Sequence, residues 1–216
     1  EICACLVGSE MCIRDRLSKS LKTELYRKAV HLSSLWMSLF ILWADRNVSI
    51  VTFSLLLALN LIVEYAAYRK TAVVGDLFRR MFIRTLRNRE VCRERFVPSG
   101  SVYILAAALI VSVCFTSRAA AAAMGVVLVA DTCAALVGKV WGTYRFSNGK
   151  SIEGAAAFFS SAVWVIVLFF PTVSPLIVFS AALLAAAAEF FEKETGIDDN
   201  FAVPLVSGFV LNLISL

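Results

Sequence analysis

Residues 48–68 read VSIVTFSLLLALNLIVEYAAY, an apolar run with a single charged residue, Glu64, near its end. A helix of about 20 apolar residues is long enough to cross the hydrocarbon core of a bilayer, which is roughly 30 Å thick. Lipid offers no partners for backbone polar groups, so a spanning segment must be a helix or part of a closed barrel. This run therefore predicts a membrane-spanning helix.

Similar runs recur along nearly all of the 216 residues, of which 60% are hydrophobic. We expect an all-α integral membrane protein with about seven transmembrane helices, and no room for a separate soluble domain. The expected spans are Tyr26–Ala44, Val48–Tyr68, Ser101–Ser117, Ala119–Val140, Ala155–Phe170, Leu176–Phe191 and Phe201–Leu216.

The first sixteen residues, EICACLVGSEMCIRDR, lack the basic-then-apolar order of a signal peptide. The stretch EMCIRDR resembles the translation of a transposon end used in preparing sequencing libraries. We therefore expect residues 1–16 to be non-native and residues 17–216 to form one polytopic membrane domain. The cysteines after residue 16 are far apart and have no metal-ligand spacing, which predicts neither a zinc site nor a disulfide framework.

The basic residues predict an orientation, because Lys and Arg concentrate on the cytoplasmic side of membrane proteins. With a cytoplasmic N-terminus, the outer loops carry only Arg46 and Arg118, and every other Lys or Arg after residue 16 lies inside. Acidic residues within spans, such as Glu64 and Glu189, also lie nearer the inner ends. This one-sided distribution predicts an active site at the cytoplasmic face and argues against a transporter, which needs polar groups through the bilayer.

The first polar constellation lies at the start of the first span, in the sequence ELYRKAVH. Glu24, Arg27, Lys28 and His31 are spaced to share one helical face. They are explained equally well as an interfacial cap whose long cations reach the headgroups, and as a clamp for phosphate oxygens in which His31 donates a hydrogen bond or carries a proton.

The second constellation surrounds Asp131, about two turns inside the predicted end of the fourth span. A carboxylate at that depth is costly unless a metal or a cation pairs with it. Gly138 and Gly142 follow on nearly the same stripe, where another helix or a phosphate could approach the backbone. The connection to the fifth span then adds four charged residues: Lys139, Arg145, Lys150 and Glu153.

The third constellation, EFFEKETGIDDNFAVP, precedes the last span. Helix capping accounts for Asn200, but Asp198 and Asp199 together exceed what a cap needs. Paired carboxylates with Asn are hard oxygen ligands that suit Mg²⁺ bridging the phosphates of a nucleotide. Glu189 is a candidate for the same pocket.

Two other segments have simpler interpretations. NGKS at residues 148–151 is not a phosphate-binding loop, because Tyr144 stands where that motif needs glycine and no strand precedes it. The basic segment from Arg69 to Arg95 is typical of an amphipathic helix on anionic headgroups.

In this order, ELYRKAVH, ADTCAALVGKVWGTYRFSNGKSIEG and GIDDNFAVPLVSG resemble the CTP-dependent lipid kinases, a family that includes dolichol kinase, phytol kinase and yeast-type diacylglycerol kinase. The middle segment is also similar to phosphatidate cytidylyltransferase. That second family's His-Gly-Gly turn and closing Asp-Arg-x-Asp are missing here, which counts against synthesis of a CDP-lipid.

The resemblance implies phosphoryl transfer from CTP to the hydroxyl of a membrane lipid, with Mg²⁺. It implies nucleotide-site roles for Asp131, Gly138, Lys139, Gly142, Lys150, Ser151, Glu153 and Gly154. It places Asp198, Asp199 and Asn200 at the metal, and Glu24, Arg27, Lys28 and His31 near the phosphates. We expect Lys139 and Lys150 to neutralise charge. Asp131 is a candidate for either the base or a metal ligand, and His31 is an alternative base.

The expected partners are the bilayer, a lipid alcohol of the diacylglycerol or polyprenol type and a nucleoside triphosphate, but no nucleic acid. The expected location is a bacterial inner membrane or its equivalent. The sequence leaves the oligomeric state open, and a homo-oligomer is one option. The alternatives are cytidylyl transfer to phosphatidate and, from another class, a small transporter or flippase.

Overall fold

The structure is a computed structural model that describes residues 23–69 and 98–215, and within these ranges it is helical with no strand. Residues 1–22 and the basic segment, apart from Arg69, lie outside the described residues. A first helix covers residues 23–33. The others are α2 (Leu35–Trp43), α3 (Arg46–Tyr68), α6 (Gly100–Cys114), α7 (Ser117–Val140), α8 (Ile152–Phe169), α9 (Pro175–Phe190), α10 (Glu192–Thr195) and α11 (Asp199–Ser215).

The helices agree with six of the seven expected apolar segments to within a few residues, but the first segment is divided. The first helix ends in a tight turn in which Ser34 N–H donates to His31 O, and α2 begins after it. Ser33 Oγ donates to Val30 O at 2.6 Å. Serine hydroxyls that bond to nearby carbonyls compete with the helical ladder, which explains a break at this pair of serines. The short α10 was not expected.

Among the described residues, three helices are long and apolar enough to cross a membrane: α3, α7 and α8. The apolar helices α6, α9 and α11 are shorter, with 15, 16 and 17 residues. This composition is that of a membrane protein.

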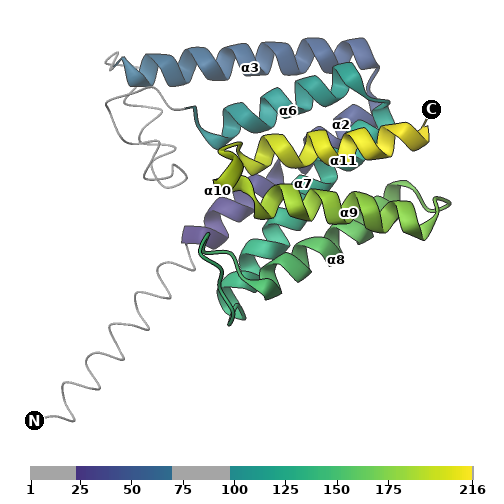
Figure 1. The fold of residues 1–216 in the computed structure, drawn as a ribbon. Coiled ribbons are helices and arrows are strands. Elements are labelled where there is room, and N and C mark those ends of the chain that lie inside the picture. Colours follow the sequence, from purple (N-terminus) through teal and green to yellow (C-terminus); the bar gives the residue numbers. More distant parts are fainter. Residues whose placement is uncertain (1–22, 70–97, 216) are drawn as a thin grey trace, which may run out of the picture.

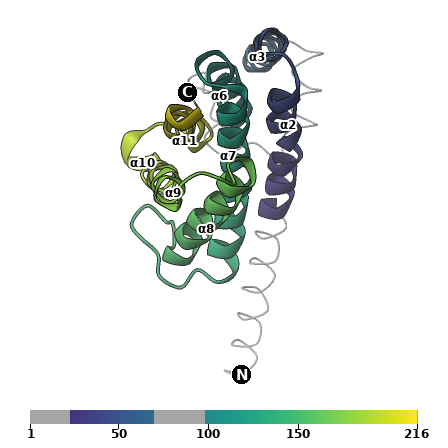
Figure 2. The same ribbon diagram turned by 90° about the vertical axis from the view of Figure 1, so that its right-hand side faces the viewer.

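Helix α7 lies at the centre and packs against α2, α6, α8 and α11. In Figure 2, α2 lies on one side of α7, and α9 and α11 lie on the other. Helix α3 packs mainly against α6 at the edge of the bundle. Only 11% of the α3 span is buried, against 67% of the α7 span, so α3 presents most of its apolar surface outwards.

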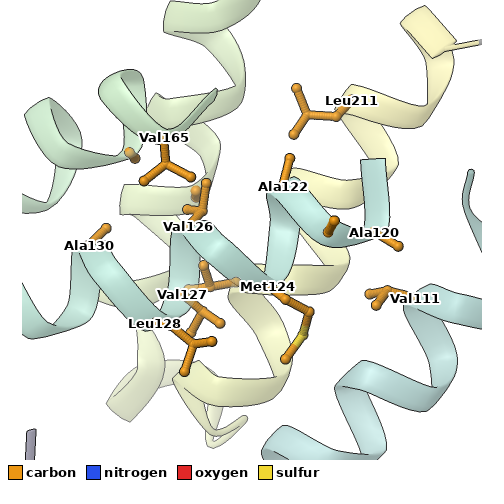
Figure 3. Close-up of a cluster of buried hydrophobic side chains, with 14 of the residues drawn as sticks. Val111, Ala120, Ala122, Met124, Val126, Val127, Leu128, Ala130, Val165 and Leu211 are labelled. Atoms are coloured by element: carbon orange, nitrogen blue, oxygen red, sulfur yellow. The ribbon is translucent and has the colours of Figure 1, made fainter. Parts of the chain in front are cut away.

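Small side chains on α7 let the other helices approach it closely. Residues 119–123 are five consecutive alanines with no exposed surface. Figure 3 shows Ala120 and Ala122 beside Val111 of α6 and Leu211 of α11, and Val126 beside Val165 of α8. In lipid, where apolar burial drives little association, such close packing holds helices together.

The connections fall at two ends of the bundle. The α7–α8 connection and α10 lie at one end, and the α2–α3 and α8–α9 connections lie at the other with the end of α11 (Figure 1). The polar residues expected at a site belong mostly to the first of these ends.

Candidate functional site

Asp131 is the buried acidic group on α7, and residues of the first helix surround it. Its Oδ2 forms an ion pair with Lys28 Nζ and lies 3.4 Å from His31 Nε2. Lys28 is only 5% exposed and Asp131 7%. A buried carboxylate needs a partner of opposite charge, and Lys28 supplies it. Of the two partners that the sequence left open for Asp131, a metal or a cation, the described residues supply the cation, and a role at a metal stays a prediction.

His31 has a spare bonding position beside that ion pair. Its Nε2 is buried and makes no hydrogen bond to any described residue, since the 3.4 Å approach to Asp131 lacks hydrogen-bond geometry. Buried polar atoms normally have a partner. His31 Nε2 is therefore available to a group that enters the site.

Glu24 contacts two other cations, Arg27 of the predicted clamp and Lys139 of the predicted nucleotide site. Its Oε1 lies 2.8 Å from Arg27 Nη2, and its Oε2 lies 3.6 Å from Lys139 Nζ at the end of α7. The contact ties the first helix to α7 and keeps both cations at the same end of the bundle.

Gly138, Gly142 and Gly154 lie where α7 and its connection meet the start of α8. A Cβ on Gly138 would lie 2.8 Å from Ser151 Oγ, and one on Gly142 would lie 2.1 Å from Gly138 O. A Cβ on Gly154 would lie 3.0 Å from Ala134 O. The stripe admits another helix, which was one of its two interpretations. A nucleotide role for these glycines stays a prediction.

The α7–α8 connection is held by its own polar side chains. Arg145 Nη2 donates to Gly138 O at 2.8 Å, and Thr143 N–H donates to Glu153 Oε1 at 2.9 Å. Ser151 caps α8 by accepting from Gly154 N–H at 3.1 Å. Glu153 and Ser151, which were expected at the nucleotide, therefore shape the loop that carries Lys150.

Lys150 joins this loop to the end of α9. Its Nζ lies 2.8 Å from Glu189 Oε1 and 3.5 Å from Glu192 Oε2, and it also donates to Glu189 O. Burial by itself lowers the pKa of Lys150. The opposite effect is larger and comes from the charge of Glu189, the hydrogen bond to it and the charges of Asp199 and Glu192, so the pKa lies above its ordinary value. Lys150 is a firmly protonated cation.

A cluster of three carboxylates follows. Oxygens of Glu192, Asp198 and Asp199 lie within 4.8 Å of one another. The turn between them is made by Gly196, whose φ of 70° is the left-handed conformation that glycine tolerates, and it folds α10 back towards the start of α11. Oxygen-rich clusters of this kind suit Mg²⁺ or Ca²⁺.

Asn200 connects two of these carboxylates. Its Nδ2 donates to Asp198 Oδ1 at 2.7 Å and to Asp199 Oδ1 at 3.2 Å. Its Oδ1 is buried and accepts no hydrogen bond from the described residues. Asp198, rather than Asn200, caps α11, because its Oδ1 accepts from Asn200 N–H at 3.1 Å. Asn200 therefore bridges the two carboxylates through its Nδ2, and a metal at this cluster stays a prediction.

Ion pairs connect the three constellations. Lys28 and Glu24 of the first contact Asp131 and Lys139 of the second. Lys150 of the second contacts Glu189 and Glu192 of the third. Glu192 is the member of the acidic cluster that the sequence argument did not assign to the metal. A signal for it was present, because Gly196 between Glu192 and Asp198 marks a turn that brings the two acids together.

Known proteins offer relatives but no function. The chain is 27% identical over 183 residues to an uncharacterized protein of Rickettsia prowazekii, an alignment that covers 83% of this chain and 88% of the relative. It is 30% identical over 123 residues to an uncharacterized protein of Methanocaldococcus jannaschii, covering 56% of this chain and 61% of that relative. No protein-family profile and no solved structure matches the chain.

Proposed function

We propose that the protein transfers the γ-phosphoryl group of CTP to the hydroxyl of a membrane lipid, with Mg²⁺. One observation carries the proposal: the carboxylates of Glu192, Asp198 and Asp199 gather within 4.8 Å beside the cation Lys150. Phosphoryl transfer needs a metal, cations around the moving charge and a positioned hydroxyl, and little covalent chemistry from the protein. The choice of CTP as donor rests on the family resemblance.

The acidic cluster would hold the metal. Asp198, Asp199 and Glu192 supply carboxylate oxygens, and Asn200 supplies its unmatched amide oxygen. A bound Mg²⁺ would neutralise charge on the β- and γ-phosphates. Asp131 is not assigned to the metal, because Lys28 already compensates its charge.

The cations at this end of the bundle would receive the nucleotide. Lys150 is already held by Glu189 and Glu192, so its position is set before substrate arrives. Arg27 and Lys139, both bound to Glu24, would exchange that carboxylate for phosphate oxygens.

The acceptor hydroxyl would bind at His31. Its Nε2 is unpartnered among the described residues and accepts the hydroxyl proton as the oxygen attacks the γ-phosphorus. The new bond joins the lipid oxygen to phosphorus, and the bond between phosphorus and the β–γ bridging oxygen breaks, leaving a lipid phosphate and CDP. Asp131 Oδ2, which lies 3.4 Å from His31 Nε2, stabilises the imidazolium that forms.

The membrane arrangement belongs to the same proposal. The first helix with α2, then α3, α6, α7, α8, α9 and α11, would make seven spans with the N-terminus in the cytoplasm. Two observations support this arrangement: the alternation of connections between the two ends (Figure 1), and the location of most of the described Lys and Arg residues at the end that carries the α7–α8 connection. The site then faces the cytoplasm, where the nucleotide is.

A labelling experiment tests the activity. The purified chain without residues 1–16 would be incubated with Mg²⁺, a panel of lipid alcohols and CTP labelled on the γ-phosphate, with ATP in a parallel reaction. Label in a lipid establishes the kinase and names its acceptor. No transfer to any alcohol, together with a labelled CDP-lipid from phosphatidate and α-labelled CTP, would instead establish cytidylyl transfer.

A further inference from the structure

Glu64 is a buried acid on a helix that presents most of its surface outwards. It lies one turn before the end of α3 and is 6% exposed. Its partners are at the start of α6: Ser99 N–H donates to Oε2 at 3.1 Å, Ser99 Oγ donates to Oε1, and Ser101 Oγ donates to Oε1 at 3.1 Å. The proposed reaction does not involve Glu64, Ser99 or Ser101.

The arrangement stabilises a carboxylate at a costly position. Removing a charge from water costs several kcal/mol unless hydrogen bonds or opposite charge compensate. The start of a helix does so, because its N–H groups are unpaired and its dipole favours negative charge. Glu64 thereby sets where α6 begins relative to α3.

The start of α6 also adjoins the acidic cluster. Gly100 stands between the two serines, and the nearest atom to a Cβ built on it would be Asn200 Nδ2, 3.6 Å away. That same nitrogen donates to Asp198 and Asp199. The first turn of α6, which packs beside α11, therefore lies next to the amide that bonds to these two carboxylates.

We propose that Glu64 is a positioning residue for the divalent cation, acting through the first turn of α6 and Asn200 on Asp198 and Asp199. The inference rests on the metal site of the proposed function. If Glu64 is removed, the start of α6 moves, the Asn200 amide gains freedom, and the two carboxylates repel each other into a wider arrangement. Metal affinity falls although no ligand has been changed.

Binding of Mn²⁺ to the purified full chain in detergent, followed by electron paramagnetic resonance, tests this without nucleotide. We expect Glu64→Ala to weaken Mn²⁺ binding by about tenfold, the lower range for residues that orient metal ligands. Glu64→Gln retains one side-chain oxygen that can accept from Ser99 and should lose less. Ser99→Ala should weaken binding too, and its effect should not add to that of Glu64→Ala.

Asn212→Ala is the matched control. Asn212 Oδ1 accepts from Thr116 N–H at 2.8 Å near the opposite end of α11, so its loss lowers thermal stability without touching the cluster. Unchanged Mn²⁺ affinity in folded Glu64→Ala and Ser99→Ala would overturn the inference. An equal loss in Asn212→Ala would do the same, since it would show general destabilisation.

Failure of the proposed activity gives a different pattern. If the unmodified protein binds Mn²⁺, the variants weaken binding as expected and no phosphoryl transfer occurs, then the inference stands and the activity is wrong. If the unmodified protein binds no Mn²⁺, both the metal site and the positioning role are wrong.

Discussion

Lys28, in the middle of the described part of the first helix, forms an ion pair with Asp131 in the second half of α7, 103 residues later in the chain. The pair joins the first helix to the central helix, and both side chains are buried, so water cannot solvate either charge if the other is removed. His31 lies one turn further along and meets the same carboxylate. Removal of either partner should therefore affect both stability and the proposed chemistry.

Asp131→Asn should destabilise the protein by about 3–5 kcal/mol, because it leaves the buried Lys28 charge without its partner. Thermal unfolding in detergent measures the effect. Replacing both residues together, Lys28→Met with Asp131→Leu, should recover most of the stability but not the turnover. Near-normal turnover of Asp131→Asn would contradict its assigned role in stabilising the His31 imidazolium.

Substitution in the acidic cluster should raise the Mg²⁺ concentration needed for half-maximal turnover. We expect Asp199→Asn and Glu192→Gln each to do so by about tenfold or more, since each removes a charged ligand. Glu194→Gln is the control, because Glu194 lies on the same short helix but outside the cluster. A metal titration at saturating CTP decides the matter, and an equal shift in Glu194→Gln would argue for a general electrostatic effect.

The ion pairs of Lys150 predict a dependence of stability on pH. The pKa of this ammonium is raised above its ordinary value of 10.5, so the folded state holds the proton more tightly than the unfolded state. The stabilisation is complete below pH 10.5 and is lost as the pH rises through the raised pKa. Unfolding midpoints between pH 8 and 12 should fall more for the unmodified protein than for Lys150→Met. Parallel curves would show that the pairs contribute little.

The glycines between α7 and α8 should differ in their tolerance of alanine. Gly142→Ala would place a methyl group 2.1 Å from a backbone oxygen, whereas the nearest atom to a methyl on Gly138 is a serine hydroxyl at 2.8 Å. Overpacking typically costs about 1–3 kcal/mol, and we expect Gly142→Ala at the upper end. Ser151→Ala should relieve part of the strain of Gly138→Ala and less of that of Gly142→Ala. Gly100→Ala, with 3.6 Å available, serves as the control in the same unfolding measurements.

The hydropathy of the sequence predicts where the helices lie. It predicts their ends less well, because these depend on hydrogen-bonded caps that hydropathy does not register. Thr116 caps α7 by accepting from Ala119 N–H at 3.4 Å. Ser117 therefore belongs to α7, whereas the sequence predicted it at the end of the preceding helix. The break at Ser34 was missed because hydropathy does not register competition between serine hydroxyls and the helical ladder. Both are short-range hydrogen-bonding effects.

Sequence patterns alone indicate a helical, apolar chain. Asp131 stands out because a charge in an apolar run is costly, and the Asp198–Asn200 run stands out because two adjacent acids exceed what a helix cap needs. His31 and Lys150 stand out in polar motifs that carry the family resemblance. Which charge compensates which depends on how the helices pack. Asp131 pairs with Lys28, Lys150 pairs with Glu189 and Glu192, and Glu64 bonds to the start of α6. Helical periodicity relates residues a few positions apart, whereas these partners come from different helices and are set by how the helices pack around α7.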